Sequence, residues 1–203
     1  MKHRAANLEG AMSLRGEEDR TADFAAQFQS SFRVLWLIAV GIIGDSSLAE
    51  DIVQESAIIA LNKLDQFQTG TNFRAWTGQI VRNVAFNRSR KERRRRATDS
   101  HSCTVEGRTL ETSRGGVAED GSGAGERQAF DDRVLLALRD VGEIARACLL
   151  LRTLEDLEYS EISRLLEIPE GTAMSHVHRT RRYLRDRLAD VWEERTGRPL
   201  SGA

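Results

Sequence analysis

The chain is poor in the residues that cross-link or rigidify small proteins, with two cysteines and two prolines among 203 residues. Cys103 and Cys148 lie far apart in unlike surroundings. This separation excludes a disulfide-stapled scaffold and a zinc module built on four thiolates. Neither cysteine suggests a function by itself.

Long apolar runs are also missing. The longest, Val34 to Ile43, is well short of the roughly 18 consecutive apolar residues that a membrane-spanning helix requires, so we expect no membrane insertion. Residues 1–20 mix acidic and basic side chains without an apolar centre, so we expect no secretory signal there. Both absences predict a cytoplasmic protein.

An excess of one charge is absent as well, because 30 Lys and Arg residues face 31 Asp and Glu residues. The charges are nevertheless segregated along the chain. Residues 74–96 and 179–187 are strongly basic, with Glu92 and Asp186 as their only acids, whereas residues 45–55 are acidic and hold no base. This distribution predicts a nucleic-acid binder that presents an acidic face to another partner.

Hydrophobic spacing predicts an all-α fold of two small helical domains joined by a flexible linker. Apolar residues recur at intervals of three and four over residues 21–96 and again over residues 131–195, which is the helical period. Between them, residues 97–130 are rich in Gly, Ser, Thr and acidic residues and predict the linker. We expect a flexible N-terminal extension at residues 1–20 and a C-terminal tail at residues 196–203.

The second domain ends in a predicted helix-turn-helix. Tyr159 to Leu166 forms a short amphipathic helix, Pro169 marks the turn, and Thr172 to Trp192 forms a longer Arg-rich helix. Free backbone N–H groups at the start of the second helix favour a DNA phosphate. An ordinary surface helix with a basic face is the alternative, but the three features together favour DNA binding.

Three aromatic residues, Phe67, Phe73 and Trp76, lie beside the polar loop Gln68 to Asn72 and the first basic block. Aromatic and basic side chains in this combination can grip unpaired bases by stacking while holding the backbone. Phe73 and Trp76 also keep the helical period, however, and on spacing alone they are better interpreted as core residues.

Two blocks of the sequence resemble the extracytoplasmic-function sigma factors. The block similar to their region 2 comprises Asp51-Ile-Val-Gln54-Glu55, Phe67, Phe73-Arg-Ala-Trp76, Ile80 and Arg82-Asn83. The block similar to their region 4 comprises Tyr159-Ser-Glu161-Ile162, Leu165-Leu166, Ile168-Pro169-Glu-Gly171-Thr172, Ser175 and Arg179 to Arg182. Both blocks occur in the family's order with a linker between them, which makes the resemblance specific.

The resemblance implies a transcription initiation factor that binds core RNA polymerase, recognises minus-35 duplex DNA, and melts and traps the minus-10 element. It implies polymerase binding by Asp51, Gln54 and Glu55. The positions implied in capture of minus-10 DNA are Gln68, Thr69, Gly70, Thr71, Asn72, Trp76, Asn83 and Arg90. The positions implied at minus-35 DNA are Thr172, Ser175, His176, His178, Arg179 and Arg182.

The pair Met174-Ser175 and the run from Gly70 to Trp76 are similar to subgroups whose sigma factors are held by anti-sigma proteins, so we expect an anti-sigma partner. Met174, His176, Arg139 and Asn87 stand where family members usually carry other residues. The departures at Met174, His176 and Arg139 imply an unusual minus-35 sequence, Asn87 bears on the promoter sequence more generally, and none of them changes the sigma class.

Enzyme and metal functions are not expected. His176 and His178 are two residues apart on a predicted helix, so their side chains point to different faces, and His101 and Cys103 fall in the predicted linker. No nucleophile adjoins a base, so we expect no catalytic residue, metal or cofactor. Two other classes compete with this interpretation. A stand-alone helix-turn-helix regulator would not account for the acidic face at residues 51–55. An anti-sigma or adaptor protein would not account for the two basic blocks.

Overall fold

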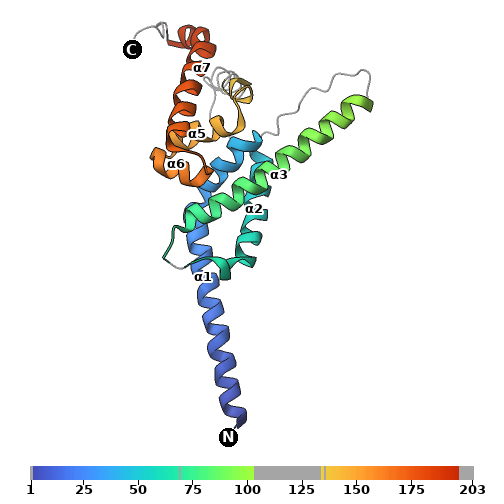
Figure 1. Ribbon diagram of the computed structural model, residues 1–203, viewed down its shortest axis with the longest axis vertical. Helices are drawn as coiled ribbons and strands as arrows, with labels where there is room; N and C mark the ends of the chain where they lie inside the picture. Colours follow the sequence, from blue (N-terminus) through green and yellow to red (C-terminus); the bar gives the residue numbers. More distant parts are fainter. Residues whose placement is uncertain (1, 69, 103–133, 135, 197–203) are drawn as a thin grey trace, which may run out of the picture.

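The computed structural model describes residues 2–68, 70–102, 134 and 136–196, and within these ranges it contains helices and no strand (Figure 1). This confirms the all-α fold class. The helices are α1 (Lys2–Ile43), α2 (Ser46–Asn62), the short 3-10 helix η1 (Leu64–Gln66), α3 (Phe73–Ser102), α5 (Glu143–Leu154), α6 (Tyr159–Leu166) and α7 (Glu170–Thr196). We refer to α1–α3 as the N-terminal half and to α5–α7 as the C-terminal half.

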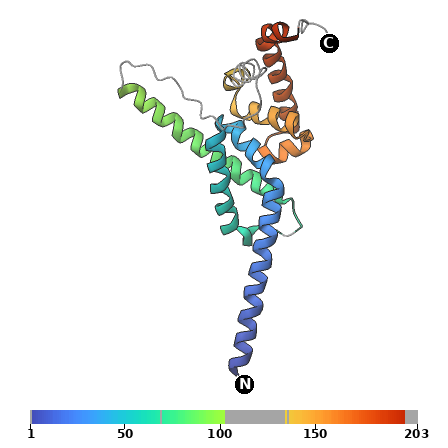
Figure 2. The same cartoon turned by 180° about the vertical axis from the view of Figure 1, so that it is seen from behind.

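Helix α1 packs against helices of both halves. Its first part projects alone from the rest of the molecule, and its last turns lie among α2, α3 and α5 (Figures 1 and 2). The N-terminal end of α1 and the C-terminal end of α7 therefore lie at opposite ends of the structure.

The apolar run in α1 is buried on nearly every side. Its buried residues are Val34, Leu35, Leu37, Ile38, Ala39 and Ile42. A helix that is apolar all round needs neighbours on several faces, and α2, α3 and α5 supply them. The segment Arg20–Ile43 is long and apolar enough to span a membrane by length and composition, but this core packing accounts for its apolar character.

The two halves share one hydrophobic core. Buried side chains from α1, α2, α3, α5, α6 and α7 form a single cluster, which includes Ile38, Val81, Leu151, Ile162 and Val177. Cys148 is fully buried in the same cluster, and burial raises the pKa of its thiol to about 12. The sequence predicted two small domains, and the structure packs them directly against each other.

A second, aromatic core closes the far end of the N-terminal half. Phe73 is buried, and its ring meets Phe24 and Phe67 edge-on with centroids 5.5 Å apart. The half-buried Trp76 packs on Phe67 with centroids 5.1 Å apart. The interpretation as a core residue is confirmed for Phe73, whereas Trp76 packs against this core and stays half-buried. Edge-on contacts of this kind stabilise beyond the area that they bury.

Three helix limits differ from the sequence prediction. Helix α1 begins at Lys2 although residues 1–20 were expected to be a flexible extension, and α3 continues to Ser102, past the expected start of the linker at residue 97. Residues 2–20 are rich in good helix formers, and residues 97–102 contain neither Gly nor Pro, so neither segment carries a stop signal strong enough to end the helix. Helix α7 begins at Glu170 directly after Pro169. Most of the predicted linker and the tail from residue 197 lie outside the described residues.

Asp45 caps the start of α2, as its residue type predicts. Its carboxylate Oδ1 accepts a hydrogen bond from the backbone N of Leu48 at 2.9 Å. We expect Asp45→Ala to lower the free energy of unfolding by about 1 kcal/mol, because the N–H of Leu48 loses its partner. Chemical denaturation measures this loss. The control Asp45→Asn retains a capping oxygen, and an equal loss in that variant would contradict the capping role.

Candidate nucleic-acid interface

The acidic residues of α2 lie on its solvent side. Asp51, Gln54 and Glu55 are exposed, whereas Ile52 and Val53 between them are buried in the core. The helical period thus separates an acidic face from an apolar one. Two exposed apolar residues, Ile58 and Leu61, continue the acidic side toward the end of the helix. We define the α2 face as Asp51, Gln54, Glu55, Ile58 and Leu61; sequence reasoning missed its apolar part.

The loop between η1 and α3 is held by its own polar groups. Gly70 has a φ of +90°, which favours glycine, and the hydroxyl of Thr71 donates to the carbonyl of Gln68 at 2.7 Å. Asn72 caps α3, since its side-chain oxygen accepts from the backbone N of Ala75 at 3.0 Å. Gln68, Gly70, Thr71 and Asn72 are exposed, and Thr69 lies outside the described residues.

Three of the predicted site residues form a stripe along α3. Trp76, Asn83 and Arg90 are spaced by seven residues, which places them on one side of the helix at intervals of about 10 Å. Asn83 and Arg90 are exposed, whereas Trp76 is half-buried in the aromatic core. The stripe therefore begins at a rigid aromatic support and runs outward over polar and basic side chains.

The helix-turn-helix predicted from the sequence is present in α6 and α7. Between the two helices, Glu167 adopts a left-handed conformation with φ of +49°, and the hydroxyl of Ser163 donates to the carbonyl of Ile168 at 2.6 Å. Pro169 then precedes the first residue of α7. Ala173 and Val177 turn inward and are fully buried, so α7 is anchored along one side.

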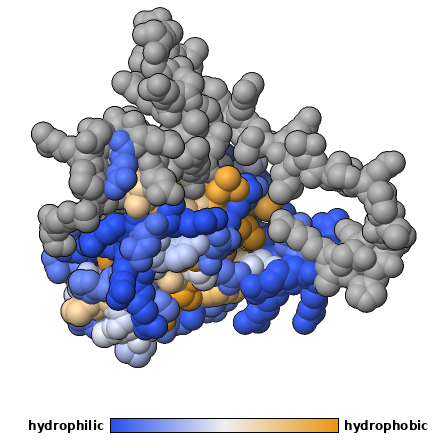
Figure 3. Space-filling model, turned by 90° about the horizontal axis from the view of Figure 1, so that it is seen from above, coloured by the Kyte–Doolittle hydropathy of each residue, from blue (hydrophilic) through white to orange (hydrophobic). Residues whose placement is uncertain are grey.

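The outward side of α7 carries the residues expected at minus-35 DNA. His178, Arg179 and Arg182 are exposed, and Thr172 and Ser175 are half-buried in the first two turns of the helix. The spacing from Thr172 through Ser175 and Arg179 to Arg182 is three, four and three residues, which keeps them on one face. Seen from the end where α7 lies, the described surface is mostly hydrophilic (Figure 3).

His176 lies beside this face in an open recess, which is also lined by Asp140, Arg179 and Tyr183. Burial, together with the neighbouring charge of Arg179, lowers the pKa of His176 from its usual value near 6.5. The imidazole is therefore neutral near pH 7 and offers a hydrogen-bond donor and an acceptor instead of a positive charge. No group of three or more metal-ligating side chains occurs in the described part of the chain.

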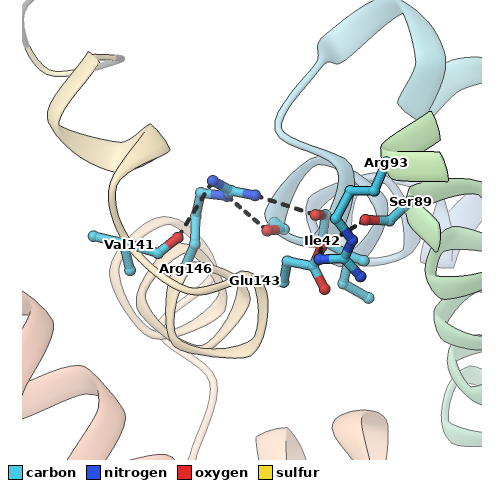
Figure 4. A network of polar contacts seen from close by, with 7 residues as sticks. Ile42, Ser89, Arg93, Val141, Glu143 and Arg146 are labelled. Atoms are coloured by element: carbon cyan, nitrogen blue, oxygen red, sulfur yellow. Dashed lines mark hydrogen bonds and ion pairs between the residues drawn. The ribbon is translucent and has the colours of Figure 1, made fainter. Parts of the chain in front are cut away.

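The contacts between the two halves were not foreseen from the sequence. Arg146 of α5 is buried and donates to the carbonyl oxygens of Gly41 at 2.7 Å and Ile42 at 3.1 Å, at the end of α1 (Figure 4). It thereby caps a helix of the other half. Burial lowers the pKa of Arg146, and the nearby carboxylate of Glu143 opposes this shift. No local sequence signal links residues 105 positions apart.

Comparison with protein families assigns the same two parts. Residues 28–95 match the family model described as Sigma-70 region 2, and residues 131–184 match the model described as Sigma-70, region 4. The ECF RNA polymerase sigma factor SigW of Bacillus subtilis is 28% identical over 87% of this chain and 93% of its own length. The ECF RNA polymerase sigma-E factor of Salmonella typhimurium is 30% identical over 64% of this chain and 69% of its own length.

A solved structure has a similar fold. The sigma factor RpoE from Bartonella quintana, in complex with the anti-sigma factor NepR, matches with a TM-score of 0.59 and 25% sequence identity. The match covers 82% of this chain and 96% of that one. The family matches, the relatives and this fold agree: the chain belongs to the ECF RNA polymerase sigma factors, which are transcription initiation factors and not enzymes.

Proposed function

We propose that this sigma factor works through three separate surfaces. The α2 face binds core RNA polymerase, the loop before α3 and the outer side of α3 capture the minus-10 strand, and α7 reads the minus-35 duplex. The observation that carries this assignment is exposure: none of the described residues expected in these roles is buried, although those outside the loop before α3 lie on helices whose opposite sides form the core. The protein is cytoplasmic, and an anti-sigma partner keeps it from core polymerase until it is needed; the complex of the Bartonella quintana sigma factor with NepR supports the anti-sigma partner.

Capture of the minus-10 strand requires groups that compensate for the stacking lost when a base leaves the duplex, which amounts to a few kcal/mol. The exposed amide of Asn83 can pair with a base edge, and Arg90, on the same side of α3, can hold the phosphate backbone. Trp76, which is only half-buried, stands at the start of the stripe and is the aromatic residue that could contact a base.

Reading of the minus-35 duplex requires a helix in the major groove with side chains on base edges. Helix α7 presents Arg179 and Arg182 for this purpose, and its first turn offers backbone N–H groups to a phosphate. The neutral His176 can read a base through its ring nitrogens but adds little nonspecific charge attraction.

The defining experiment adds the purified protein to bacterial core RNA polymerase and maps the transcripts made on genomic DNA fragments. Discrete start sites that disappear without the protein support the proposal, and their alignment gives both promoter elements. Site-specific DNA binding by the protein alone, without a stable complex with core polymerase, would instead make it a stand-alone regulator.

We expect Asn83→Ala to reduce open-complex formation while leaving association with core polymerase unchanged, because Asn83 is exposed on α3 and is not part of the α2 face. Permanganate footprinting of promoter DNA measures opening, and native gel filtration measures association. An equal loss of both would contradict the assigned role of Asn83.

We expect Arg179→Ala to weaken minus-35-dependent promoter binding by about 1–3 kcal/mol if its guanidinium contacts a base. Competition between promoters with matched and altered minus-35 elements measures this discrimination in the holoenzyme. Arg187→Ala, at an exposed position two turns further along α7, serves as the control. Loss of affinity without loss of discrimination would assign Arg179 to a phosphate contact.

A further inference from the structure

A single carboxylate lies beside the DNA-reading side of α7. We propose that Asp140, held in place by Tyr183, is a specificity-determining residue. Its negative charge opposes the attraction of Arg179 to DNA phosphates, so that the guanidinium binds a duplex chiefly where it finds a matching base. This inference rests on the proposed role of α7 at the minus-35 element and adds to that role a source of sequence preference.

The open recess beside His176 brings these groups together. One wall is the turn that leads into α5, which contributes Asp140, and the other wall is α7, which contributes His176, Arg179 and Tyr183. His176 and Arg179 also belong to the residues expected at minus-35 DNA. A DNA strand that reaches either side chain therefore passes close to the carboxylate.

Tyr183 fixes the position of this carboxylate. Its hydroxyl donates to Oδ2 of Asp140 at 3.2 Å, across the recess. The turn is closed by its own backbone, because the N of Val141 donates to the carbonyl of Leu138 at 3.3 Å. Asp140 is exposed and forms no ion pair with any residue that the structure describes. Its charge is therefore held in place without being cancelled by a neighbouring base.

Arg179 is likewise held without being neutralised. Its Nε donates to the carbonyl of Ser175 at 3.3 Å, one turn earlier in α7, and none of the described acids pairs with its guanidinium. His176 adds no charge near pH 7, since burial and the charge of Arg179 lower its pKa. The recess thus carries one positive and one negative charge. For an approaching phosphate, the repulsion by the acid offsets the attraction by the base.

The rest of α7 attracts phosphates whatever the sequence. Four further arginines are exposed along it: Arg181, Arg182, Arg185 and Arg187. A phosphate contact raises the affinity for every sequence alike, whereas a contact to a base edge raises it for one. Base edges are uncharged, so a nearby carboxylate weakens a guanidinium bond to a base less than a bond to a phosphate. Asp140 therefore raises the ratio of specific to nonspecific binding, which distinguishes promoters from other DNA.

The test compares variants of the full chain with the wild type. Asp140→Asn removes the charge and keeps an oxygen that can accept from Tyr183. Tyr183→Phe removes the hydroxyl and keeps the ring. The control, Asp156→Asn, removes the same charge from an exposed position outside the recess, where Arg152 is its partner. Asparagine also accepts the positive φ of this position.

Two measurements separate charge attraction from sequence reading. Titration of a fluorescein-labelled duplex of random sequence with the full chain, at several salt concentrations, gives the nonspecific affinity. Competition between promoters with matched and altered minus-35 elements gives the discrimination by the holoenzyme. We expect Asp140→Asn to bind the random duplex about three- to tenfold tighter, with a salt slope steeper by up to about 0.9, and to lose discrimination by a similar factor. Asp156→Asn should match the wild type in both.

Tyr183 acts through Asp140 as a positioning residue, so Tyr183→Phe should shift both measurements in the same direction by a smaller factor. In the Asp140→Asn background it should add nothing, because the charge that it positions is already gone. A purely structural role would instead lower stability and leave the salt slope unchanged. Circular dichroism during urea denaturation measures the stability of each variant.

The outcomes that contradict the proposal differ in what else they remove. If Asp140→Asn binds the random duplex no tighter than Asp156→Asn, or strengthens binding to matched and altered promoters equally, Asp140 does not determine specificity. The assignment of α7 then still stands, provided that Arg179→Ala loses discrimination. If Arg179→Ala loses affinity alone, Arg179 is a phosphate contact and the inference fails. If Arg179→Ala loses neither, the proposed role of Arg179 at the minus-35 element falls together with the inference.

Discussion

Replacing Ile38 by alanine is expected to lower the free energy of unfolding by about 2–5 kcal/mol. Ile38 is fully buried in α1, and its Cδ1 lies beside Gly78 of α3, at the point where Leu165 of α6 also approaches. Removing this side chain leaves a cavity at the meeting point of three helices from both halves. The loss combines the transfer free energy of the missing carbons with the cost of the cavity.

Urea denaturation followed by circular dichroism measures this effect. Ile58→Ala is the matched control, because Ile58 is 64% exposed on α2 and undergoes the same chemical change. We expect the control to stay within about 0.5 kcal/mol of the wild type. Since the core is shared, both halves should lose stability together in Ile38→Ala. A variant that destabilised α1–α3 alone would show that the halves do not share this core in solution.

Reversing charge on the α2 face is expected to abolish stable association with core RNA polymerase. The double variant Asp51→Lys with Glu55→Lys turns two exposed acids on one side of α2 into bases. Close charge pairs across an interface contribute about 1.5–7 kcal/mol each, so two reversals should weaken the complex by at least about 100-fold. Both residues are exposed and outside the core, so the fold should persist.

Binding of fluorescently labelled core polymerase at several salt concentrations tests this expectation. Asp23→Lys is the control for charge, because Asp23 is also an exposed acid but lies on α1, outside the α2 face. An equal loss in Asp23→Lys would indicate a general charge effect. Unchanged association of the double variant with core polymerase would show that the α2 face does not form the polymerase contact.

Local patterns were sufficient to predict the helical segments and the helix-turn-helix, although three helix limits differed from the prediction. The spacing of Ile162 and Leu166, followed by Pro169, locates α6 and its turn. These features depend on residues within a few turns of one another. The aromatic core could be interpreted in the same way, since Phe73 and Trp76 keep the helical period.

The junction between the halves could not be predicted from local patterns. Arg146 looks like a surface residue in the sequence, and only the fold brings it to the carbonyls of Gly41 and Ile42. One signal was present: Val34 to Ile43 is apolar on every face, which indicates a helix covered from several sides. The roles of the individual site residues remain predictions, which the variants above are designed to test.

Because Cys148 is buried in the core, the reactivity of its thiol can report how often the core becomes accessible to solvent. A thiol that is inaccessible and ionises only near pH 12 scarcely reacts with a maleimide while the core stays packed. Labelling at this position then requires a fluctuation that lets reagent reach α5. After Cys103 is replaced by serine, the labelling rate becomes a measure of how often the unperturbed core admits solvent.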